Sequence, residues 1–410
     1  YTLLSNYKRP LYRDRFTATV RELTPDGIEP VYDCTVPGPA RFDGNGLVVH
    51  NCGEIIGSNF HCNLSEIHLN NIDPENHKEQ EEAFTAGALS VATLLNHQFI
   101  VPRYRYSREL DPIVGVSFTG LFDFFVKAFG VEWLQWLMEG RPKTARGLEF
   151  GEREAAYLTR WREIVHRAVW DYCDRHQMKR PNRCTTVQPS GTKSLLTNAA
   201  PGWHPPFGLR WVRRITFAKN DPVALACLDY GYSVIPGQSG KDEKGNLLDD
   251  PFDDRVKEWL VEIPVQVSWI DVPGVEEIAI ENFTATTMFD YYMQVQKHWT
   301  THNTSATILL GEDEIEPLSD RIYEAIRDDE GYISAALLAR FDAPFPRLPF
   351  ERISKDKYLE MRSDMLRRQK SDNFSKLLDN RVLESMLPET GPQDAACSGI
   401  SCEFKGSEGL

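Results

Sequence analysis

The sequence predicts an α/β protein preceded by a small all-β segment. From residue 52 onward, stretches of helical periodicity alternate with short apolar stretches of strand character. Strands that alternate with helices are typical of α/β domains. Residues 1–51 instead combine strand-forming residues with turn signals. Residues 388–410 are rich in Gly, Ser, Asp and Glu, which predicts a flexible tail.

Each element is predicted from its local pattern. In the first segment, 16–20 and 31–36 have strand composition, and 25–27 and 43–46 have turn composition. Further along, helical periodicity predicts helices at 78–95, 121–138, 153–176, 287–300 and 318–328. Apolar segments predict strands at 185–187, 215–217, 232–235, 260–267 and 306–310.

Composition narrows the function. A chain of 410 residues allows two to three domains, and no apolar run or signal peptide suggests a membrane or secretory address. We therefore expect a cytoplasmic protein, and the start at Tyr1 suggests a fragment or a processed product. The net charge of -14 disfavours nonspecific binding to nucleic acid or to an anionic membrane. An anionic substrate would therefore need a local anion site.

The eight cysteines do not form a C-x-x-C pair, which disfavours a structural zinc site, and we predict no metal ligands. Cys34, Cys173, Cys184 and Cys227 lie in apolar surroundings and are predicted to be packing residues. The other cysteines lie in motifs that indicate chemistry.

His50-Asn51-Cys52 has the residue order that protein splicing requires at its downstream end. The Asn side-chain amide attacks its own carbonyl and cleaves the following peptide bond. The next residue must be a nucleophile, which by then holds the upstream segment as a thioester. A neighbouring His supplies protons at neutral pH.

These residues end a longer pattern, 31–38, Phe42 and 45–51, which resembles the C-terminal blocks of inteins over nearly all of residues 30–51. The resemblance implies a Hint-type all-β fragment. It implies that Asp33 is the acidic block residue, His50 the penultimate histidine, Asn51 the cyclising residue and Cys52 the downstream nucleophile. Ala40 stands where the family usually has a His, and the intein's own first nucleophile would lie upstream. The chain therefore should not splice alone.

Cys52-Gly53-Glu54, followed by Cys62-Asn63-Leu64, resembles the finger loop of ribonucleotide reductases. In that family a thiyl radical on the first Cys removes the 3′-hydrogen of a ribose. A carboxylate two residues further along an extended loop faces the same way and takes the 3′-hydroxyl proton. The resemblance makes Cys52 the thiyl, Glu54 the general base and Cys62 one of two reducing thiols. The motif Asn and the partner of Cys62 would lie upstream.

Two further motifs match the same family. Gln188-Pro189-Ser190-Gly191-Thr192, before the helix-prone 193–199, resembles its substrate-phosphate loop, where backbone N–H groups at a helix N-terminus bind anions. Cys397 and Cys402 lie in the predicted tail, where the reductases place a thiol pair that reduces the active-site disulfide by exchange. The reductant of that pair would be a thioredoxin-like protein.

Residues 302–308 resemble the Asn-x-Ser-x-Thr-Ile strand of the adenosylcobalamin-dependent class. Tyr291 and Tyr292 lie in a core-like helical pattern and away from where a tyrosine radical relay would sit. Residues 213–251 look most like the monomeric, triphosphate-reducing members. This resemblance implies adenosylcobalamin as cofactor and a ribonucleoside triphosphate as substrate.

The predicted organisation follows. Residues 1–51 would be the intein fragment, 52–387 the C-terminal half of a ten-stranded α/β barrel with its finger loop, and 388–410 the redox tail. The upstream half of the protein, with the N-terminal part of the intein, would be the splicing partner. Two alternatives remain open, namely a large-subunit fragment of a metallosubunit-dependent (class I) reductase and a module that only splices.

Overall fold

The computed structural model describes residues 41–44, 47–50, 60–339 and 346–386. The chain divides into two compact units, Tyr1–Asn51 and Cys52–Leu410. Within the described parts of both units, no helix is long and apolar enough to cross a membrane.

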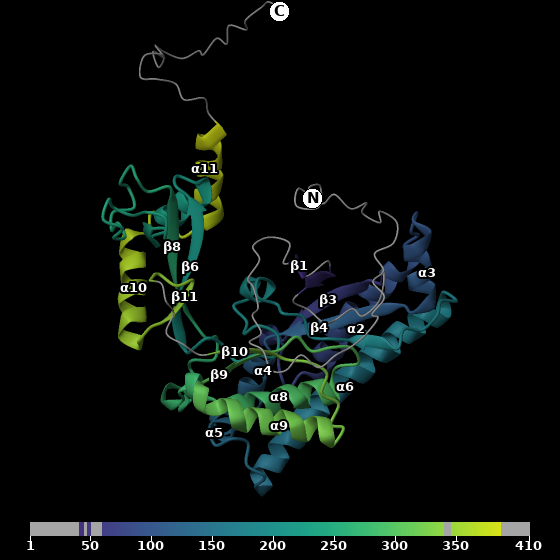
Figure 1. The fold of residues 1–410 in the computed structure, drawn as a ribbon. Helices are drawn as coiled ribbons and strands as arrows, with labels where there is room; N and C mark the ends of the chain where they lie inside the picture. The colour runs from purple at the N-terminus through teal and green to yellow at the C-terminus, as the bar shows by residue number, and fades with distance from the viewer. Residues whose placement is uncertain (1–40, 45–46, 51–59, 340–345, 387–410) are drawn as a thin grey trace, which may run out of the picture. The chain divides into compact units, whose positions relative to one another are not determined.

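The described part of the first unit is one β-hairpin (Figure 1). β1 (Arg41–Gly44) pairs antiparallel with β2 (Leu47–His50), in a register that sets Arg41 opposite His50 and Gly44 opposite Leu47. This register leaves Asn45-Gly46 between the strands, the dipeptide that most favours a two-residue hairpin turn. The predicted strands at 16–20 and 31–36 lie outside the described residues.

The second unit contains a parallel sheet with the strand order β3-β4-β5. β3 (Cys62–His68), β4 (Ile113–Thr119) and β5 (Arg183–Thr185) all run in the same direction. Each crossover contains helices, as parallel strands require. β4 is buried along its whole length and has the continuous apolar character of a strand covered on both faces, so it lies at the centre of the sheet.

Two helices of the first crossovers begin where the sequence supplies a capping side chain. α2 (His77–Thr93) begins after Asn76, whose side chain accepts the Glu79 N–H at 3.1 Å. α6 (Ala145–Arg175) begins after Thr144, which accepts the Gly147 N–H at 3.1 Å. The helix predicted at 153–176 is therefore longer than its periodicity indicated. α3 (Pro102–Leu110), which was not predicted, starts with proline at its first position.

The single helix predicted at 121–138 is two helices. α4 (Leu121–Phe129) and α5 (Val131–Met138) are separated by Gly130, whose φ of +75° cannot continue a right-handed helix. The apolar period continues through this break because both helices bury the same kind of side chain. The period therefore gave no sign of it.

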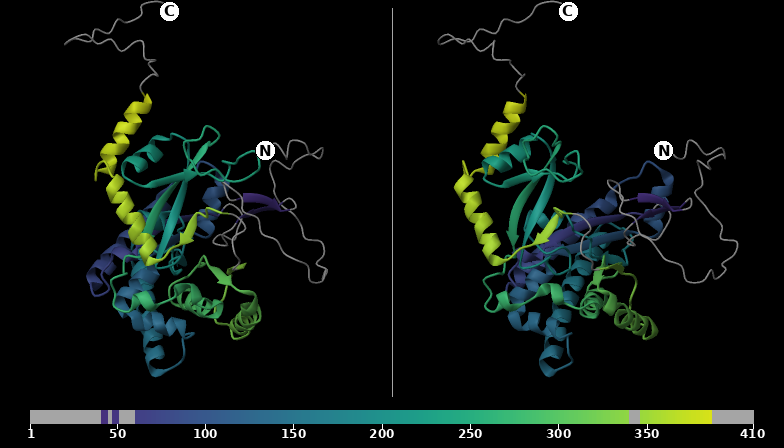
Figure 2. Two further views of the ribbon diagram at one scale, coloured as in Figure 1. Left: turned by 90° about the vertical axis from the view of Figure 1, so that its left-hand side faces the viewer. Right: turned by 60° about the vertical axis from the view of Figure 1, so that its left-hand side comes forward.

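A second pair of parallel strands, β9 (Thr307–Leu310) and β10 (Ala336–Ala339), follows later in the chain. α8 (Ala285–His298) precedes β9, and α9 (Ile315–Arg327) connects the two strands. Figures 1 and 2 show these two helices side by side. A parallel bridge between Val187 and Thr304 links the segment after β5 with the segment before β9. The described strands do not close into a barrel, so the ten-stranded barrel stays a prediction.

The strands predicted at 215–217, 232–235 and 260–267 form a separate antiparallel sheet with the order β11-β6-β8-β7. The strands are β6 (Arg210–Ala218), β7 (Ser233–Pro236), β8 (Glu258–Gln266) and β11 (Phe350–Arg352). The helices of this region are α7 (Pro222–Asp229), α10 (Lys355–Arg368) and α11 (Phe374–Met386). The sequence predicted these strands but not their partners, because an apolar run does not specify its pairing.

The parallel strands and their helices share an extensive aromatic core. Its fully buried side chains include Phe84, Phe118, Phe122, Trp133, Trp161, Tyr291 and Trp299. The antiparallel sheet has a smaller core, formed by Ala224, Cys227, Val234, Val256, Trp259 and Val261. The prediction of an α/β fold is confirmed. The described residues of the second unit form two distinct hydrophobic cores.

Candidate active site

The predicted site residues are described only in part. Cys62 and the loop 189–192 lie within the described residues. His50 ends β2, but its side chain is not among those described. The remaining predicted residues lie outside the described part of the chain, namely Asp33, Asn51, Cys52, Glu54, Cys397 and Cys402. Their roles stay predictions.

Alternate side chains of β3 define two faces of the parallel sheet. Ser65 and Ile67 face α2, because the Ser65 hydroxyl donates to the Gly87 carbonyl at 3.0 Å and Ile67 packs against the same glycine. Cys62, Leu64, Glu66 and His68 therefore share the opposite face, which we call the open face. Leu64 is 45% exposed there. The predicted reducing thiol thus lies on a face that a ligand can reach.

Gly115 of β4 provides the space for the Cys62 side chain. The register places Gly115 opposite Leu64. A Cβ atom at Gly115 would stand 2.9 Å from Cys62 Sγ, 2.6 Å from Leu64 Cδ2 and 2.8 Å from Thr186 Cγ2. All three distances are shorter than a carbon makes without displacing its neighbour. A glycine is therefore required wherever the thiol keeps this position.

The predicted phosphate loop follows β5 and lies against β3. The Gln188 N–H donates to Ser117 Oγ at 2.9 Å, and the Gln188 side-chain amide donates to the Ser65 carbonyl at 3.0 Å. Ser190 is buried and donates its hydroxyl proton to Glu66 Oε1. Glu66 is on the open face, four residues after Cys62 in β3. At ~3.3 Å per residue, the two residues are about 13 Å apart along the strand. Thiol and loop belong to one surface.

The helix expected at 193–199 is a single 3-10 turn, Lys193–Leu196. So short a helix has little macrodipole. The prediction that a helix N-terminus helps to bind an anion here is therefore wrong. The positive charge at this place comes from Lys193. Its Nζ lies 3.0 Å from Glu66 Oε2, and it also donates to the Gln188 side-chain carbonyl.

The segment after the loop is fixed to the carboxyl ends of β3 and β4. His68 Nδ1 lies 2.7 Å from Thr197 Oγ1, and Asn70 donates to the Thr197 carbonyl at 2.8 Å. Asp123 accepts the Ala200 N–H at 2.7 Å and the Trp269 indole N–H at 2.6 Å. Burial raises the pKa of Asp123 to about 6, against the opposing effect of these two donors. Sequence reasoning missed these residues.

His204 joins this segment to β9. Its Nδ1 lies 3.1 Å from the Pro201 carbonyl, and its Nε2 lies 3.0 Å from the Thr307 N–H. The contacts assign a neutral ring with the proton on Nδ1, because Nε2 must accept. Burial lowers the pKa of His204 to about 4, which keeps the ring neutral at physiological pH.

The other predictions for individual side chains can be compared directly. Cys173, Cys184 and Cys227 are buried, so the packing prediction is confirmed for them, while Cys34 lies outside the described residues. Burial raises the pKa of the Cys184 thiol well above its ordinary value, which makes this thiol unreactive. Tyr291 and Tyr292 are fully buried in α8, as the core pattern predicted. Tyr292 donates to the Ser334 carbonyl at 2.9 Å.

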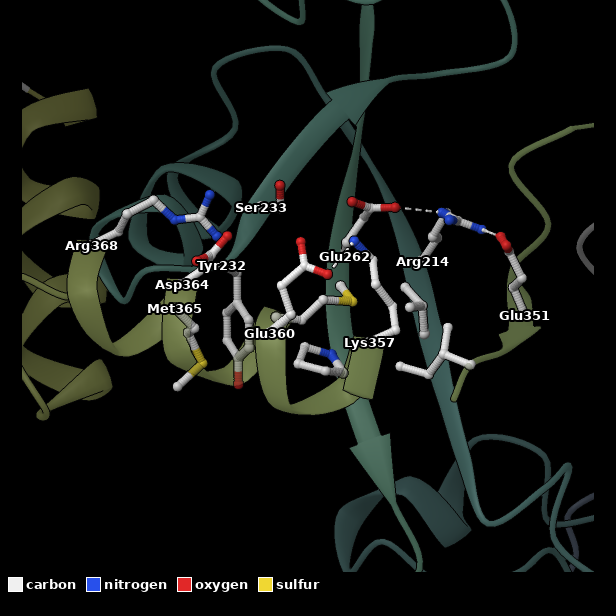
Figure 3. A pocket seen from close by; sticks show the side chains of 14 residues that line it. Arg214, Tyr232, Ser233, Glu262, Glu351, Lys357, Glu360, Asp364, Met365 and Arg368 are labelled. Carbon is white, nitrogen blue, oxygen red and sulfur yellow. Dashed lines mark hydrogen bonds and ion pairs between the residues drawn. The ribbon is translucent and has the colours of Figure 1, made fainter. Parts of the chain in front are cut away.

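A cavity of about 220 Å³ lies between α10 and the antiparallel sheet, and neither Cys62 nor the loop 189–192 lines it (Figure 3). Its polar lining is largely paired within itself. Figure 3 shows Arg214 between two carboxylates, with Nε 2.8 Å from Glu262 and Nη1 2.6 Å from Glu351. A second hollow on α6 measures about 410 Å³ and is lined by His166 and Trp170.

Neither hollow fits a corrin cofactor, which is larger than the drug-sized ligands held by pockets of ~300–1,000 Å³. Among the described residues there is also no group of three or more His, Cys, Asp or Glu side chains able to hold a metal ion. We assign no described residue to a cobalamin.

The structure is similar to the crystal structure of a B-12 dependent (class II) ribonucleotide reductase, with a TM-score of 0.61 at 19% identity over 81% of this chain and 43% of that one. This likeness concerns the fold. No protein-family model matches the chain.

Curated relatives of the chain are named adenosylcobalamin-dependent ribonucleoside-triphosphate reductase. The protein of that name from Lactobacillus delbrueckii subsp. bulgaricus is 25% identical over 370 residues, which are 87% of this chain and 46% of the relative. The protein of the same name from Levilactobacillus brevis is 26% identical over 316 residues, which are 75% of this chain and 39% of the relative. The predicted resemblance to adenosylcobalamin-dependent ribonucleoside-triphosphate reductases is confirmed, and the resemblance of residues 30–51 to inteins stays a prediction. The chain spans about half the length of the curated relatives it matches.

Proposed function

We propose that this chain is part of an adenosylcobalamin-dependent ribonucleoside-triphosphate reductase that makes deoxyribonucleotides for DNA synthesis in the cytoplasm. The observation that supports this most is the similarity to reductases of that name over 87% of the chain. The open face supports it independently, because it presents the Cys62 thiol and the predicted phosphate loop on one surface. The resemblance of 302–308 and 213–251 to the triphosphate-reducing type points to the same substrate.

In the proposed reaction Cys52, as a thiyl radical, takes the 3′-hydrogen of the ribose, and Glu54 takes the 3′-hydroxyl proton. The 2′-hydroxyl leaves as water. Cys62 and a second thiol upstream supply two electrons and two protons and close as a disulfide. Cys52 then returns the 3′-hydrogen and becomes a thiyl again. The sum converts a ribonucleotide and two thiols into a deoxyribonucleotide, water and a disulfide.

The phosphate loop would orient this substrate. Pro189, Ser190, Gly191 and Thr192 follow β5, and Ser190 contacts Glu66, which is four residues beyond Cys62 on β3. An extended nucleotide that binds the loop and lies along the open face would therefore have its ribose toward the thiol. Lys193 supplies a positive charge at the loop. This local charge offsets the net charge of -14, which would otherwise repel a triphosphate.

Renewal of the active site needs a reductant for the Cys62 disulfide. We assign this step to Cys397 and Cys402, whose thiols would exchange with the disulfide and then be reduced by a thioredoxin-like protein. Adenosylcobalamin would supply the radical that starts each cycle.

The chain would reach its active form by protein splicing. The hairpin β1–β2 supports this proposal, because it ends at His50 directly before Asn51 and Cys52, where a Hint-type fragment would bring its last strand to the scissile bond. Asp33 and His50 would assist Asn51 in cyclising, and Cys52 would receive the upstream half. That half would supply the remaining strands of the ten-stranded barrel.

Co-expression of this chain with its upstream half tests the proposal. We expect a ligated protein that contains Cys52 and lacks residues 1–51, measured by intact mass. We also expect deoxynucleotide formation that depends on adenosylcobalamin and is lost in Cys52→Ala. Lack of ligation would contradict the splicing part, and reduction that survives Cys52→Ala would contradict the radical part.

The same experiment separates the two alternatives. A metallosubunit-dependent reductase would form deoxynucleotide only with a partner subunit and would not respond to adenosylcobalamin. A module that only splices would yield the ligated mass without reductase activity under either condition.

A further inference from the structure

Glu66 lies beneath the predicted phosphate loop, where a phosphate site is expected to have cations. Its side chain is only 4% exposed. Oε1 accepts the hydroxyl proton of Ser190, and Oε2 lies 3.0 Å from Lys193 Nζ. The Ser190 hydroxyl and the Lys193 ammonium group, which an anion at the loop could contact, are therefore already in contact with a carboxylate of the chain itself.

The loop needs such a support because its backbone is strained. Ser190 has a φ of +53°, in the left-handed region that is unfavourable for a non-glycine residue. Ser190 is buried, and its hydroxyl points to Glu66. The remaining support comes from Gln188, which donates to the Ser65 carbonyl and accepts from Lys193. The hydrogen bond to Glu66 therefore helps to stabilise this conformation of Ser190.

The charge of Glu66 has a separate effect. A buried carboxylate is costly unless a cation or donors compensate it, so it retains Lys193. Lys193 is 47% exposed and can therefore also be approached from solvent. A substrate phosphate would compete with Glu66 for the same ammonium group, and its negative charge would be repelled by the carboxylate.

We propose that Glu66 is the internal counter-ion of the phosphate loop, a positioning residue that holds Ser190 in place and competes with the substrate phosphate for Lys193. This inference rests on the proposed function for the identity of the ligand. It adds a residue that sets how tightly the loop binds an anion. Charge and hydrogen bonding can be separated by substitution, because Glu66→Gln retains an acceptor for Ser190 and loses the charge.

The first test measures the charge. Sodium tripolyphosphate is titrated into the 410-residue chain and into its Glu66→Gln variant by calorimetry at fixed ionic strength. We expect the variant to bind about tenfold more tightly, since one unit of repulsion near the anion is removed. Ser65→Ala is the matched control, because Ser65 is on the same strand and faces α2. Equal or weaker binding by Glu66→Gln would overturn the competition for Lys193.

The second test measures the support and needs no ligand. Hydrogen–deuterium exchange of the peptide covering 188–196 is compared in the wild type, Glu66→Gln and Glu66→Ala. We expect faster exchange of this peptide in Glu66→Ala alone, with the peptides of β4 unchanged, which would also show that the variant is folded. Unchanged exchange at 188–196 would overturn the positioning role.

The two tests also separate this inference from the proposed function. If neither the wild type nor Glu66→Gln binds tripolyphosphate, the phosphate loop itself is misassigned and the competition for Lys193 fails with it. The exchange result still decides whether Glu66 holds Ser190.

Discussion

The parallel and the antiparallel sheets of this chain differ in what their polar side chains contact. On the open face of β3, Cys62 and Leu64 are accessible, and Glu66 contacts groups that a ligand could also use. In the antiparallel region the charges are paired with each other, as Arg214 is with Glu262 and Glu351. Parallel strands bring their carboxyl ends to one edge, where loops can present groups to a ligand. An antiparallel sheet of this kind uses its charges for its own stability.

The separate cores provide the largest test of this contrast. Trp161 and Trp259 are both fully buried, one in each core. Replacing either with alanine should lower the free energy of unfolding by ~3–5 kcal/mol. Because the cores are distinct, hydrogen exchange should increase mainly around the parallel sheet for Trp161→Ala and around the antiparallel sheet for Trp259→Ala. Equal increases in both regions for both variants would mean that the chain has one cooperative core.

Gly115 allows a test of the open face itself. Gly115→Ala should lower the free energy of unfolding by ~1–3 kcal/mol, because the added methyl group stands too close to three side chains. It should also change the rate at which iodoacetamide labels Cys62, measured by mass spectrometry. Gly151→Ala in α6 is the control, since the nearest atom to its new Cβ is 4.0 Å away. A Gly115→Ala variant with normal stability and normal Cys62 labelling would show that this glycine does not seat the thiol.

His204 should make stability depend on pH. Its pKa in the folded chain, about 4, is below the ordinary value of 6.5, so the unfolded chain binds the proton more readily between these pH values. The free energy of unfolding should therefore fall as pH is lowered from 6.5 to 4, by up to ~1.4 kcal/mol per pH unit from this group. His204→Gln should show a shallower slope in urea titrations over that range. Parallel slopes in the two proteins would exclude the assigned neutral ring.

Asp123 should act in the opposite direction. Its raised pKa of about 6 means that its contribution to stability is present below pH 3.8 and lost as pH rises through 6. Asp123→Asn should therefore gain stability relative to the wild type as pH increases from 4 to 7, measured by urea unfolding at each pH. A constant difference across this range would contradict the raised pKa.

Exposed pairs of the antiparallel region should contribute least. Lys357 lies 3.1 Å from Glu360 on the surface of α10, with both side chains about half exposed. Lys357→Ala should change the free energy of unfolding by less than ~0.5 kcal/mol, because solvent screens such pairs. An effect above 1 kcal/mol, read from the urea midpoint, would mean that the cavity beside α10 depends on this lysine.

Several elements could be predicted from sequence because their signals are local. The long helices α2, α6 and α8 have clear apolar periods, and most residues of β8 are apolar. β3 was missed because its residues alternate between an open face and a face packed on α2, so polar side chains occur on both. β4 was missed because its apolar run passes into α4 after a single glycine, Gly120.

The site could be predicted only where a motif marks it. Cys62 and 189–192 belong to recognisable motifs, and the structure places them on one surface. Glu66, Gly115, Asp123 and His204 contact partners far away in sequence, so no short pattern distinguishes them from ordinary surface or core residues. Their roles depend on strand pairing, which the sequence of a single chain does not specify.

Protection of Cys62 by a nucleotide tests most directly the claim that thiol and loop form one site. Labelling of Cys62 by iodoacetamide in the 410-residue chain is measured with and without CTP, with the buried Cys184 as an internal reference. We predict that saturating CTP slows labelling of Cys62 severalfold and leaves Cys184 unlabelled throughout. A Cys62 labelling rate that CTP does not change would contradict the shared site.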